Sequence, residues 1–439
     1  MTGKTVDLLI HARWIIPIIP ENAVLSDCAL AILDHEIVDI LPSNEASKHY
    51  CAEQEVRLEQ HVLMPGLINS HCHSAMSLLR GYADDLPLDT WLQEHIWPAE
   101  QQWVSPEFVE AGTELAVAEM IRSGTTTFAD MYFFPEETAN VAARVGMRCQ
   151  LAFPVLDFPT AWAQDANDYI HKGLALRDNY GSHPLINIAF GPHAPYTVSD
   201  EPLQRISVLA EELQASVQIH LHETQKEISD ALNSSGQRPI QRLQQLGLLS
   251  PLTQCVHMTQ VEGEDIELLQ QHGAHVIHCP KSNLKLASGF CPTQELLDAG
   301  VNVALGTDGA ASNNGLDMFA EMNAASLLAK GVSGNAGALD AHSTLRMATL
   351  NGARALGLDS KIGSLEKGKL ADLIAVELND LEQTPLFNPA SHLVYTACGH
   401  KVSHSWVAGR ALMQDYKLQT LHTEAVQKKA RQWQQHLQP

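Results

Sequence analysis

The fold of this chain is predicted most directly from one stretch, Met64-Pro65-Gly66-Leu67-Ile68-Asn69-Ser70-His71-Cys72-His73. Its apolar start is typical of a buried strand, and two histidines close that strand. Because side chains alternate along a strand, His71 and His73 project to the same side and can chelate one metal ion. The pair alone is weak evidence, because a chain with 22 histidines contains roughly one such pair by chance.

The chain after this stretch alternates short apolar segments with longer helical stretches, such as 111–122 and 202–213. This alternation is typical of βα units around a buried parallel sheet. We count eight units, whose strands are expected to begin near Gly66, Thr125, Met147, Leu185, Ser216, Thr253, Ala274 and Asn302. The pattern predicts an α/β fold with a (β/α)8 TIM barrel over residues 66–368.

The two ends of the chain show a different pattern. Residues 1–65 contain short apolar segments separated by Asp, Asn, Pro and His, which is typical of antiparallel strands. Segments after residue 369 return to this pattern, so we expect residues 1–65 and 369–439 to form one small β-sandwich domain. A polar stretch from about Thr423 to Leu437 predicts a terminal helix that either lies on the surface or packs against the rest of the chain.

Composition argues against several classes of protein. With 28 Lys and Arg against 51 Asp and Glu, the net charge of -23 repels nucleic-acid phosphates and anionic lipid surfaces. No run reaches the roughly 18 apolar residues that span a bilayer. The eight cysteines show no CxxC spacing, which argues against a zinc finger or a disulfide framework. We therefore expect a cytoplasmic protein that binds neither nucleic acid nor membrane.

Further candidate metal ligands follow other predicted strands. His220 ends the fifth and Asp308 follows the eighth, and active sites of TIM barrels gather at the carboxyl ends of the strands. The set His71, His73, His220 and Asp308 suits one Zn²⁺, with Fe²⁺ or Mn²⁺ as alternatives, and leaves room for water. The competing interpretation is structural, with hydrogen-bonded histidines and an aspartate that caps a helix.

Other motifs of the chain extend this pattern over nearly its whole length. They are Leu79-Arg80-Gly81, Trp91-Leu92, Gly191-Pro192-His193, His220-Leu221-His222-Glu223, Pro280-Lys281-Ser282-Asn283-Leu284 and Gly306-Thr307-Asp308-Gly309. With the stretch 64–73 they resemble the amidohydrolase superfamily, specifically its 5-methylthioadenosine/S-adenosylhomocysteine deaminase branch. The resemblance implies hydrolytic deamination of the adenine ring of 5-methylthioadenosine, S-adenosylhomocysteine or adenosine, which gives the inosine analogue and ammonia. It is compatible with a homo-oligomer, but the sequence reveals no interface.

Two absences refine the metal prediction. Binuclear members of the superfamily carry a carboxylated lysine at the end of the fourth strand, where this chain has Gly191-Pro192-His193. The resemblance therefore implies one metal ion. Cys279-Pro280 lacks the second cysteine of the PCxxC element, which argues against the other zinc deaminase fold.

Three residues are assigned to the chemistry. Glu223 is expected to move protons to the ring and to the departing ammonia. Asp308 is expected to bind the metal ion and to accept a proton from the attacking water. His257, at the end of the sixth strand, is expected to hydrogen-bond that water and the developing charge. The competing interpretations are an exposed glutamate and a buried structural histidine.

Substrate binding is assigned, by the resemblance, to Glu100, His193, Arg148 and Ser312, together with Glu223 and Asp308. Glu100 is placed where the branch binds ribose hydroxyls, because two carboxylate oxygens suit a diol. The alternative is a solvated glutamate in a first helical turn. His193 is expected to contact the purine or its sugar. Ser312 is expected to touch the base, although Ser and Asn after a strand are usually turn residues.

Arg148 matches a family arginine of the third strand. Some members carry another arginine for the carboxylate of the homocysteine moiety, at a position where this chain has Phe153-Pro154. This departure weakens the case for S-adenosylhomocysteine and favours 5-methylthioadenosine or adenosine.

Two other functions stay open. The same metal and glutamate can serve any aromatic carbon with a leaving group, so a guanine, triazine or other amino- or chloro-heterocycle aminohydrolase is the alternative. A non-catalytic binding homologue is a third interpretation. The presence of every proposed ligand and of Glu223 argues against it.

Overall fold

The computed structural model describes residues 3–396 and 398–437. Eight parallel strands form a barrel sheet in sequence order from β5 to β12. Their bounds are β5 Leu67–Cys72, β6 Thr125–Asp130, β7 Arg148–Val155, β8 Ile186–Pro192, β9 Val217–Leu221, β10 Thr253–His257, β11 His275–His278 and β12 Val303–Leu305. Each strand begins at the predicted residue or at the next one, so the prediction of a TIM barrel is confirmed.

The barrel closes between β12 and β5 through a few backbone hydrogen bonds. The N–H groups of Thr307 and Asp308 donate to the carbonyl oxygen of His71 at 3.1 and 3.0 Å. This contact requires glycine at position 306, because a Cβ atom there would lie 2.9 Å from the backbone nitrogen and oxygen of His71. The closure therefore places Asp308 beside His71.

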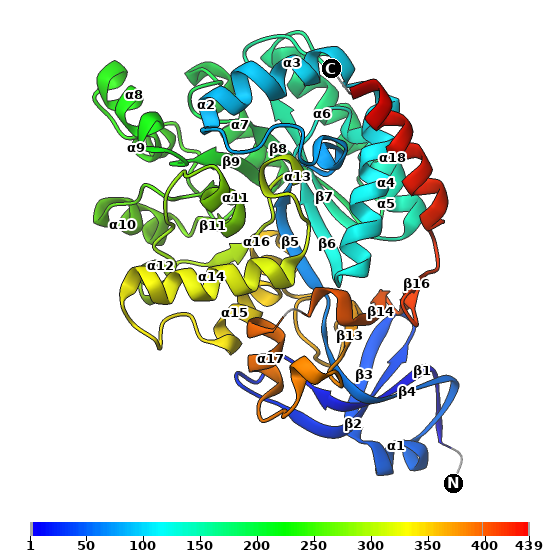
Figure 1. Cartoon of the computed structure of the whole chain (residues 1–439). Coiled ribbons are helices and arrows are strands. Elements are labelled where there is room, and N and C mark those ends of the chain that lie inside the picture. Colours follow the sequence, from blue (N-terminus) through cyan, green and yellow to red (C-terminus); the bar gives the residue numbers. More distant parts are fainter. Residues whose placement is uncertain (1–2, 397, 438–439) are drawn as a thin grey trace.

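Helices surround the barrel (Figure 1). The larger ones are α4 Pro106–Arg122, α5 Pro135–Val145, α6 Ala166–Tyr180, α7 Asp200–Leu213, α8 Gln225–Ser235, α10 Gly263–His272 and α14 Met318–Ser333. Shorter ones are α9 Pro239–Gln245, α11 Pro280–Lys285, α12 Thr293–Asp298, α13 Ala310–Asn313, α15 Ala341–Met347, α16 Leu350–Ala355 and α17 Pro389–Tyr395. Their apolar faces cover the strands, so every residue of β6, β7, β9 and β10 is buried.

The segment between β5 and α4 lies over the carboxyl end of the barrel (Figure 1). It forms η1 Ser74–Leu79, α2 Leu88–Thr90, the π-helix η2 Trp91–Ile96 and α3 Trp97–Trp103.

Among the described residues, no helix has both the length and the apolar character needed to cross a membrane.

A second sheet joins the two ends of the chain. Its eight strands follow the order β16-β15-β14-β13-β4-β1-β2-β3. Their bounds are β1 Lys4–Ile15, β2 Leu25–Leu33, β3 Glu36–Pro42, β4 Tyr50–Pro65, β13 Leu373–Glu377, β14 Val402–Val407, β15 Arg410–Gln414 and β16 Lys417–Leu418. Strand β4 pairs with both β1 and β13. Both ends therefore contribute to one β domain, as predicted.

The prediction of antiparallel strands in the N-terminal segment is partly wrong. Strands β1 and β2 are antiparallel, as are β2 and β3, but β1 and β4 are parallel, with Leu8 opposite Gln54. Alternation of apolar and polar residues reveals a strand but not the direction of its partner. A parallel pair needs a crossover connection, and α1 (Ser43–His49) lies in that connection.

The predicted terminal helix is confirmed as α18 (Thr423–Leu437). It leaves the β domain and packs along α4 of the barrel (Figure 1). Its Trp433 ring meets Phe108 edge to face, with 5.2 Å between ring centroids. Its Lys429 pairs with Glu114 at 2.7 Å.

Candidate active site

The four predicted metal ligands lie together at the carboxyl end of the barrel. The Nε2 atoms of His71 and His73 lie 3.4 and 3.2 Å from Oδ1 of Asp308. Nε2 of His220 lies 3.3 Å from Nε2 of His71. Two overlapping sets are compact enough to hold one ion, His71-His73-Asp308 and His71-His220-His257. The site therefore contains the predicted ligands and, next to them, His257.

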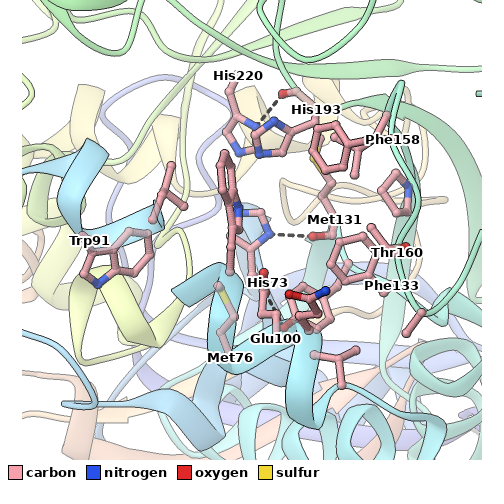
Figure 2. Close-up of a pocket in the computed structure, with 18 of the residues that line it drawn as sticks. His73, Met76, Trp91, Glu100, Met131, Phe133, Phe158, Thr160, His193 and His220 are labelled. Atoms are coloured by element: carbon pink, nitrogen blue, oxygen red, sulfur yellow. Dashed lines mark hydrogen bonds between the residues drawn. The ribbon is translucent and has the colours of Figure 1, made fainter. Parts of the chain in front are cut away.

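Hydrogen bonds at Nδ1 orient two of these imidazoles. Nδ1 of His73 lies 2.5 Å from the carbonyl oxygen of Met131, and Nδ1 of His220 lies 2.7 Å from that of His193; Figure 2 shows both contacts. Because a carbonyl oxygen only accepts, each Nδ1 carries the proton. Each Nε2 is therefore the nitrogen that faces the metal site and that binds an ion once it is deprotonated.

The third imidazole, that of His71, is oriented by Gln218. Nε2 of Gln218 donates to the carbonyl oxygen of Ser70 at 3.0 Å, so its Oε1 accepts from Nδ1 of His71 at 2.8 Å. The same nitrogen donates to Oε1 of Gln254 at 2.7 Å. The sequence analysis missed these glutamines. The available signal was an amide side chain within an apolar strand, two residues before His220.

The ionisation of the site suits a cation. Burial lowers the pKa of His71 and His220, so both imidazoles are neutral at pH 7. Burial opposes protonation of His73 as well, but the hydrogen bond and charge of Asp308 outweigh it and raise the pKa to about 9. Burial would raise the pKa of Asp308, but its hydrogen bonds with His71 and His73 hold it well below its usual range. Three imidazoles around an ionised carboxylate fit a divalent metal ion.

Two residues of the site have a left-handed backbone although they are not glycine. Their φ angles are 61° at Asp308 and 77° at His257. Such conformations cost on the order of 1–3 kcal/mol, and at a functional site the surrounding structure enforces them.

Glu223 and His257 lie side by side in the same site. Oε2 of Glu223 is 3.7 Å from Nε2 of His257, and the hydroxyl of Ser288 donates to Oε1 of Glu223 at 3.5 Å. The other ring nitrogen of His257, Nδ1, is hydrogen-bonded to Oδ1 of Asn283 at 2.8 Å. Burial, together with the charge of Asp308, raises the pKa of Glu223 to about 8. A carboxyl group that retains a proton near neutral pH is suited to general acid–base chemistry.

These groups open into a cavity of about 650 Å³, a volume typical of small-molecule sites. Glu100 of α3 also lines the cavity and lies near His73 in Figure 2. Its Oε1 accepts a hydrogen bond from the hydroxyl of Tyr132 at 2.6 Å. Burial raises the pKa of Glu100 to about 7 against the opposing effect of that hydrogen bond. Glu100 is therefore a cavity residue rather than a solvated helix residue.

The walls of the cavity are largely apolar. Trp91 lies on one side in Figure 2, with Phe133 and Phe158 on the other. His193 also lines the cavity, and burial lowers its pKa to about 4, so the ring is neutral. No lysine or arginine occurs among the described residues that line the cavity.

The assignment of Arg148 to the substrate is wrong. Arg148 is the first residue of β7, at the end of the barrel opposite the site. Its guanidinium donates to both carboxylate oxygens of Asp372, at 2.8 and 3.1 Å. The matched arginine therefore joins the barrel to the β domain.

Ser312 also differs from its predicted role. Its hydroxyl donates to Oδ2 of Asp308 at 2.8 Å, and it does not line the cavity. A second hydroxyl, that of Ser282, donates to the same oxygen at 2.6 Å. Ser312 therefore supports a proposed metal ligand and does not face the base.

Comparison with known proteins agrees with this architecture. The Amidohydrolase family matches residues 62–412 of the chain. The chain belongs to the amidohydrolase family. A 5-methylthioadenosine/S-adenosylhomocysteine deaminase of Teredinibacter turnerae is 58% identical to this amidohydrolase over 433 residues, 99% of this chain and 98% of the relative.

Two solved structures are similar to this amidohydrolase. An adenosine deaminase from Xanthomonas campestris with bound zinc matches with a TM-score of 0.98 and 47% identity over 99% of both chains. The atrazine chlorohydrolase of Arthrobacter aurescens TC1 matches with a TM-score of 0.91 but only 22% identity, over 97% of this chain and 99% of that one. The second likeness shows the shared fold alone.

Proposed function

We propose that this amidohydrolase is a metal-dependent deaminase of adenine nucleosides, with 5-methylthioadenosine as its first candidate substrate. One observation carries the proposal: metal-binding side chains, Glu223 and Glu100 line the same cavity. The metal site and Glu223 account for hydrolysis at an aromatic carbon, and Glu100 accounts for a ribose. The similarity to named adenine-nucleoside deaminases over the whole chain supports the same reaction.

The metal ion is bound by His71, His73, His220 and Asp308. Neutral imidazoles with one carboxylate favour Zn²⁺, with Fe²⁺ and Mn²⁺ as alternatives. The zinc in the Xanthomonas campestris structure supports this choice. When bound, the ion supplies Lewis acidity, which lowers the pKa of a water molecule.

Glu223 transfers protons at two atoms of the substrate. The protonated carboxyl group gives its proton to ring nitrogen N1 as the water oxygen bonds to C6. The resulting carboxylate then takes the remaining proton from that oxygen and delivers it to the amino nitrogen as the bond from C6 to that nitrogen breaks. Asp308 accepts the first proton from the water and passes it to Glu223 at the end of the cycle, and His257 hydrogen-bonds the same oxygen. The two protons of the water end on N1 of the product and on ammonia, so the reaction consumes one water molecule and no other reactant.

The substrate is oriented by groups farther along the cavity. Glu100 accepts hydrogen bonds from the ribose hydroxyls, and His193 contacts the nucleoside. The walls contain Phe133 and Phe158, and no lysine or arginine occurs among the described lining residues. A small apolar substituent on the 5′ carbon therefore fits better than a homocysteine moiety with its carboxylate.

An ammonia-release assay tests the proposal. Purified, metal-loaded enzyme is given 5-methylthioadenosine, S-adenosylhomocysteine, adenosine or guanine, with and without a chelator. We expect turnover of 5-methylthioadenosine and adenosine, weaker turnover of S-adenosylhomocysteine, loss of activity with chelator and recovery with Zn²⁺. Turnover of guanine without turnover of any nucleoside would instead support the alternative heterocycle hydrolase. Activity that resists the chelator would contradict the role of the metal.

A further inference from the structure

A second glutamate, Glu227 at the start of α8, binds the backbone that carries Glu223. Its Oε1 accepts from the N–H of His222 at 3.0 Å, and its Oε2 accepts from the N–H of Glu223 at 2.7 Å. Glu227 is buried. Because both carboxylate oxygens are used on two consecutive amides, the contact fixes the peptide plane between these amides and the direction in which the Glu223 side chain leaves the backbone.

The carbonyl groups of the same two residues are held as well. The N–H groups of Thr259 and Gln260 donate to the carbonyl oxygen of His222, at 3.0 and 3.1 Å. The hydroxyl of Thr259 donates to the carbonyl oxygen of Glu223 at 2.7 Å. The loop after β10 therefore holds the carbonyl side of residues 222 and 223, and Glu227 holds their N–H side.

These contacts enforce a turn that the chain would otherwise disfavour. His222 has a left-handed backbone, with a φ of 53°, which costs a residue with a Cβ atom about 1–2 kcal/mol. Its ring is tied at both nitrogens, because Nε2 accepts from the N–H of Ile240 at 3.2 Å and Nδ1 donates to the carbonyl oxygen of Gln260 at 3.1 Å. The turn at His222 leads the chain from β9 so that Glu223 faces His257.

We propose that Glu227 is a positioning residue for proton transfer, holding the backbone of Glu223 so that its carboxyl group reaches the substrate. Glu227 does not line the cavity and belongs to neither compact set of metal-binding atoms. It therefore acts through Glu223 and not on the substrate or the metal ion. This inference rests on the proposed function of Glu223 as the proton carrier.

The first test is Glu227→Gln, which keeps the size of the side chain but replaces one accepting oxygen with an NH₂ group. One of the two amides then loses its acceptor and faces a donor. We expect kcat to fall about 10- to 100-fold, as for a reacting group misplaced by about 1 Å. KM and zinc content should change by less than about threefold, because the contacts of substrate and metal are untouched.

A double-mutant cycle separates positioning from a general loss of structure. In the Glu223→Gln background the proton carrier is absent, so adding Glu227→Gln should lower kcat by no more than about twofold. An equal loss of kcat in both backgrounds would overturn the inference.

A matched control is Asp340→Asn at the start of α15. Asp340 also accepts a backbone N–H bond, from Ser343 at 2.9 Å, but it does not line the active-site cavity. This variant should retain the kcat of the wild type. If Asp340→Asn lowered kcat as much as Glu227→Gln, the effect would not be specific to Glu223 and the inference would fail.

A readout without turnover makes the test independent of the proposed function. Amide hydrogen exchange of the peptide 217–224 should be faster in Glu227→Gln than in the wild type, because one of the N–H groups of His222 and Glu223 loses its acceptor. Unchanged exchange would overturn the inference. A wild type that deaminates no adenine nucleoside would overturn the proposed function while leaving the exchange result intact.

Discussion

Gln218 accepts a hydrogen bond from His71, with 2.8 Å between Oε1 and Nδ1. The bond decides which nitrogen of His71 carries the proton and therefore which nitrogen faces the metal site. Gln218 itself is held by Gln254, and Gln150 donates to the same oxygen of Gln254 at 3.0 Å. A chain of buried amides in the barrel interior thus supports the first metal ligand.

Replacement of Gln218 by Leu should weaken zinc binding about 10- to 100-fold, since His71 loses the acceptor that orients it. Competition with a chromophoric chelator measures the affinity. Gln150→Leu is the control, because Gln150 is three hydrogen bonds from His71 and its loss should weaken zinc binding less. Equal zinc affinities for the wild type and Gln218→Leu would contradict the role of this amide.

Replacement of Glu223 by Gln should lower kcat by about 10²- to 10⁴-fold, the usual contribution of a general acid–base group. The metal ligands remain, so zinc stoichiometry should be unchanged. Binding of the deaminated product should also persist, because the amide has nearly the same shape as the carboxyl group. Near-normal turnover would exclude Glu223 as the proton carrier.

Replacement of Glu100 by Ala should raise the KM for 5-methylthioadenosine about 10-fold or more, since a hydrogen bond to a charged group contributes about 1.5–3 kcal/mol. The increase in the KM for 2′-deoxyadenosine should be smaller, because this nucleoside lacks one hydroxyl of the diol. Tyr132→Phe removes the neighbouring hydroxyl but keeps the carboxylate, and serves as control. An equal increase in KM for both nucleosides would argue against recognition of the diol.

Replacement of Arg148 by Met should lower the free energy of unfolding by about 3–5 kcal/mol, because Asp372 is left buried without its cation. The side chains of Arg148 and Asp372 are only 5% and 3% exposed. Urea denaturation measures the loss, and Arg148→Met/Asp372→Asn should recover part of it. The KM of the folded variant should equal that of the wild type. A raised KM at unchanged stability would restore Arg148 to the substrate site.

Stability should also depend on the ionisation of Glu321 in α14. Burial raises the pKa of this carboxyl group from 4.5 to about 8, against opposing effects of Lys281 and Asn313. Folding therefore favours the protonated form. The resulting contribution to stability is complete below the unfolded pKa and is lost as the pH rises through about 8.

The variant Glu321→Gln mimics the protonated form and lacks this dependence. Its free energy of unfolding, relative to that of the wild type, should increase from pH 5 to pH 9. One unit of pKa shift corresponds to about 1.4 kcal/mol, so the change should be a few kcal/mol at most. Urea denaturation at both pH values measures it, and a difference that stays constant with pH would contradict the burial of a neutral carboxyl group.

The barrel and its candidate metal ligands could be predicted because their signals are local. A parallel strand covered on both faces must be apolar along its length, and this leaves a readable run in each βα unit. The carboxyl ends of all eight strands meet at one face, so position along the chain already placed His71, His220 and Asp308 together. Even the helix at the C-terminus was readable from its own composition.

The partners of these residues were decided only in three dimensions. Nothing near Arg148 in the sequence indicates Asp372, which lies 224 positions later. The resemblance assigned this arginine to the substrate, although the predicted strand begins beside it. The amide of Gln218 and the carboxylate of Glu227 gain their roles from which backbone and side-chain atoms they meet. The sequence by itself determined the barrel and predicted the candidate metal ligands, because strand period and strand ends are local properties, and a matched motif predicted the proton carrier. The orientation of these groups depends on hydrogen bonds between distant segments, which only the tertiary structure brings together.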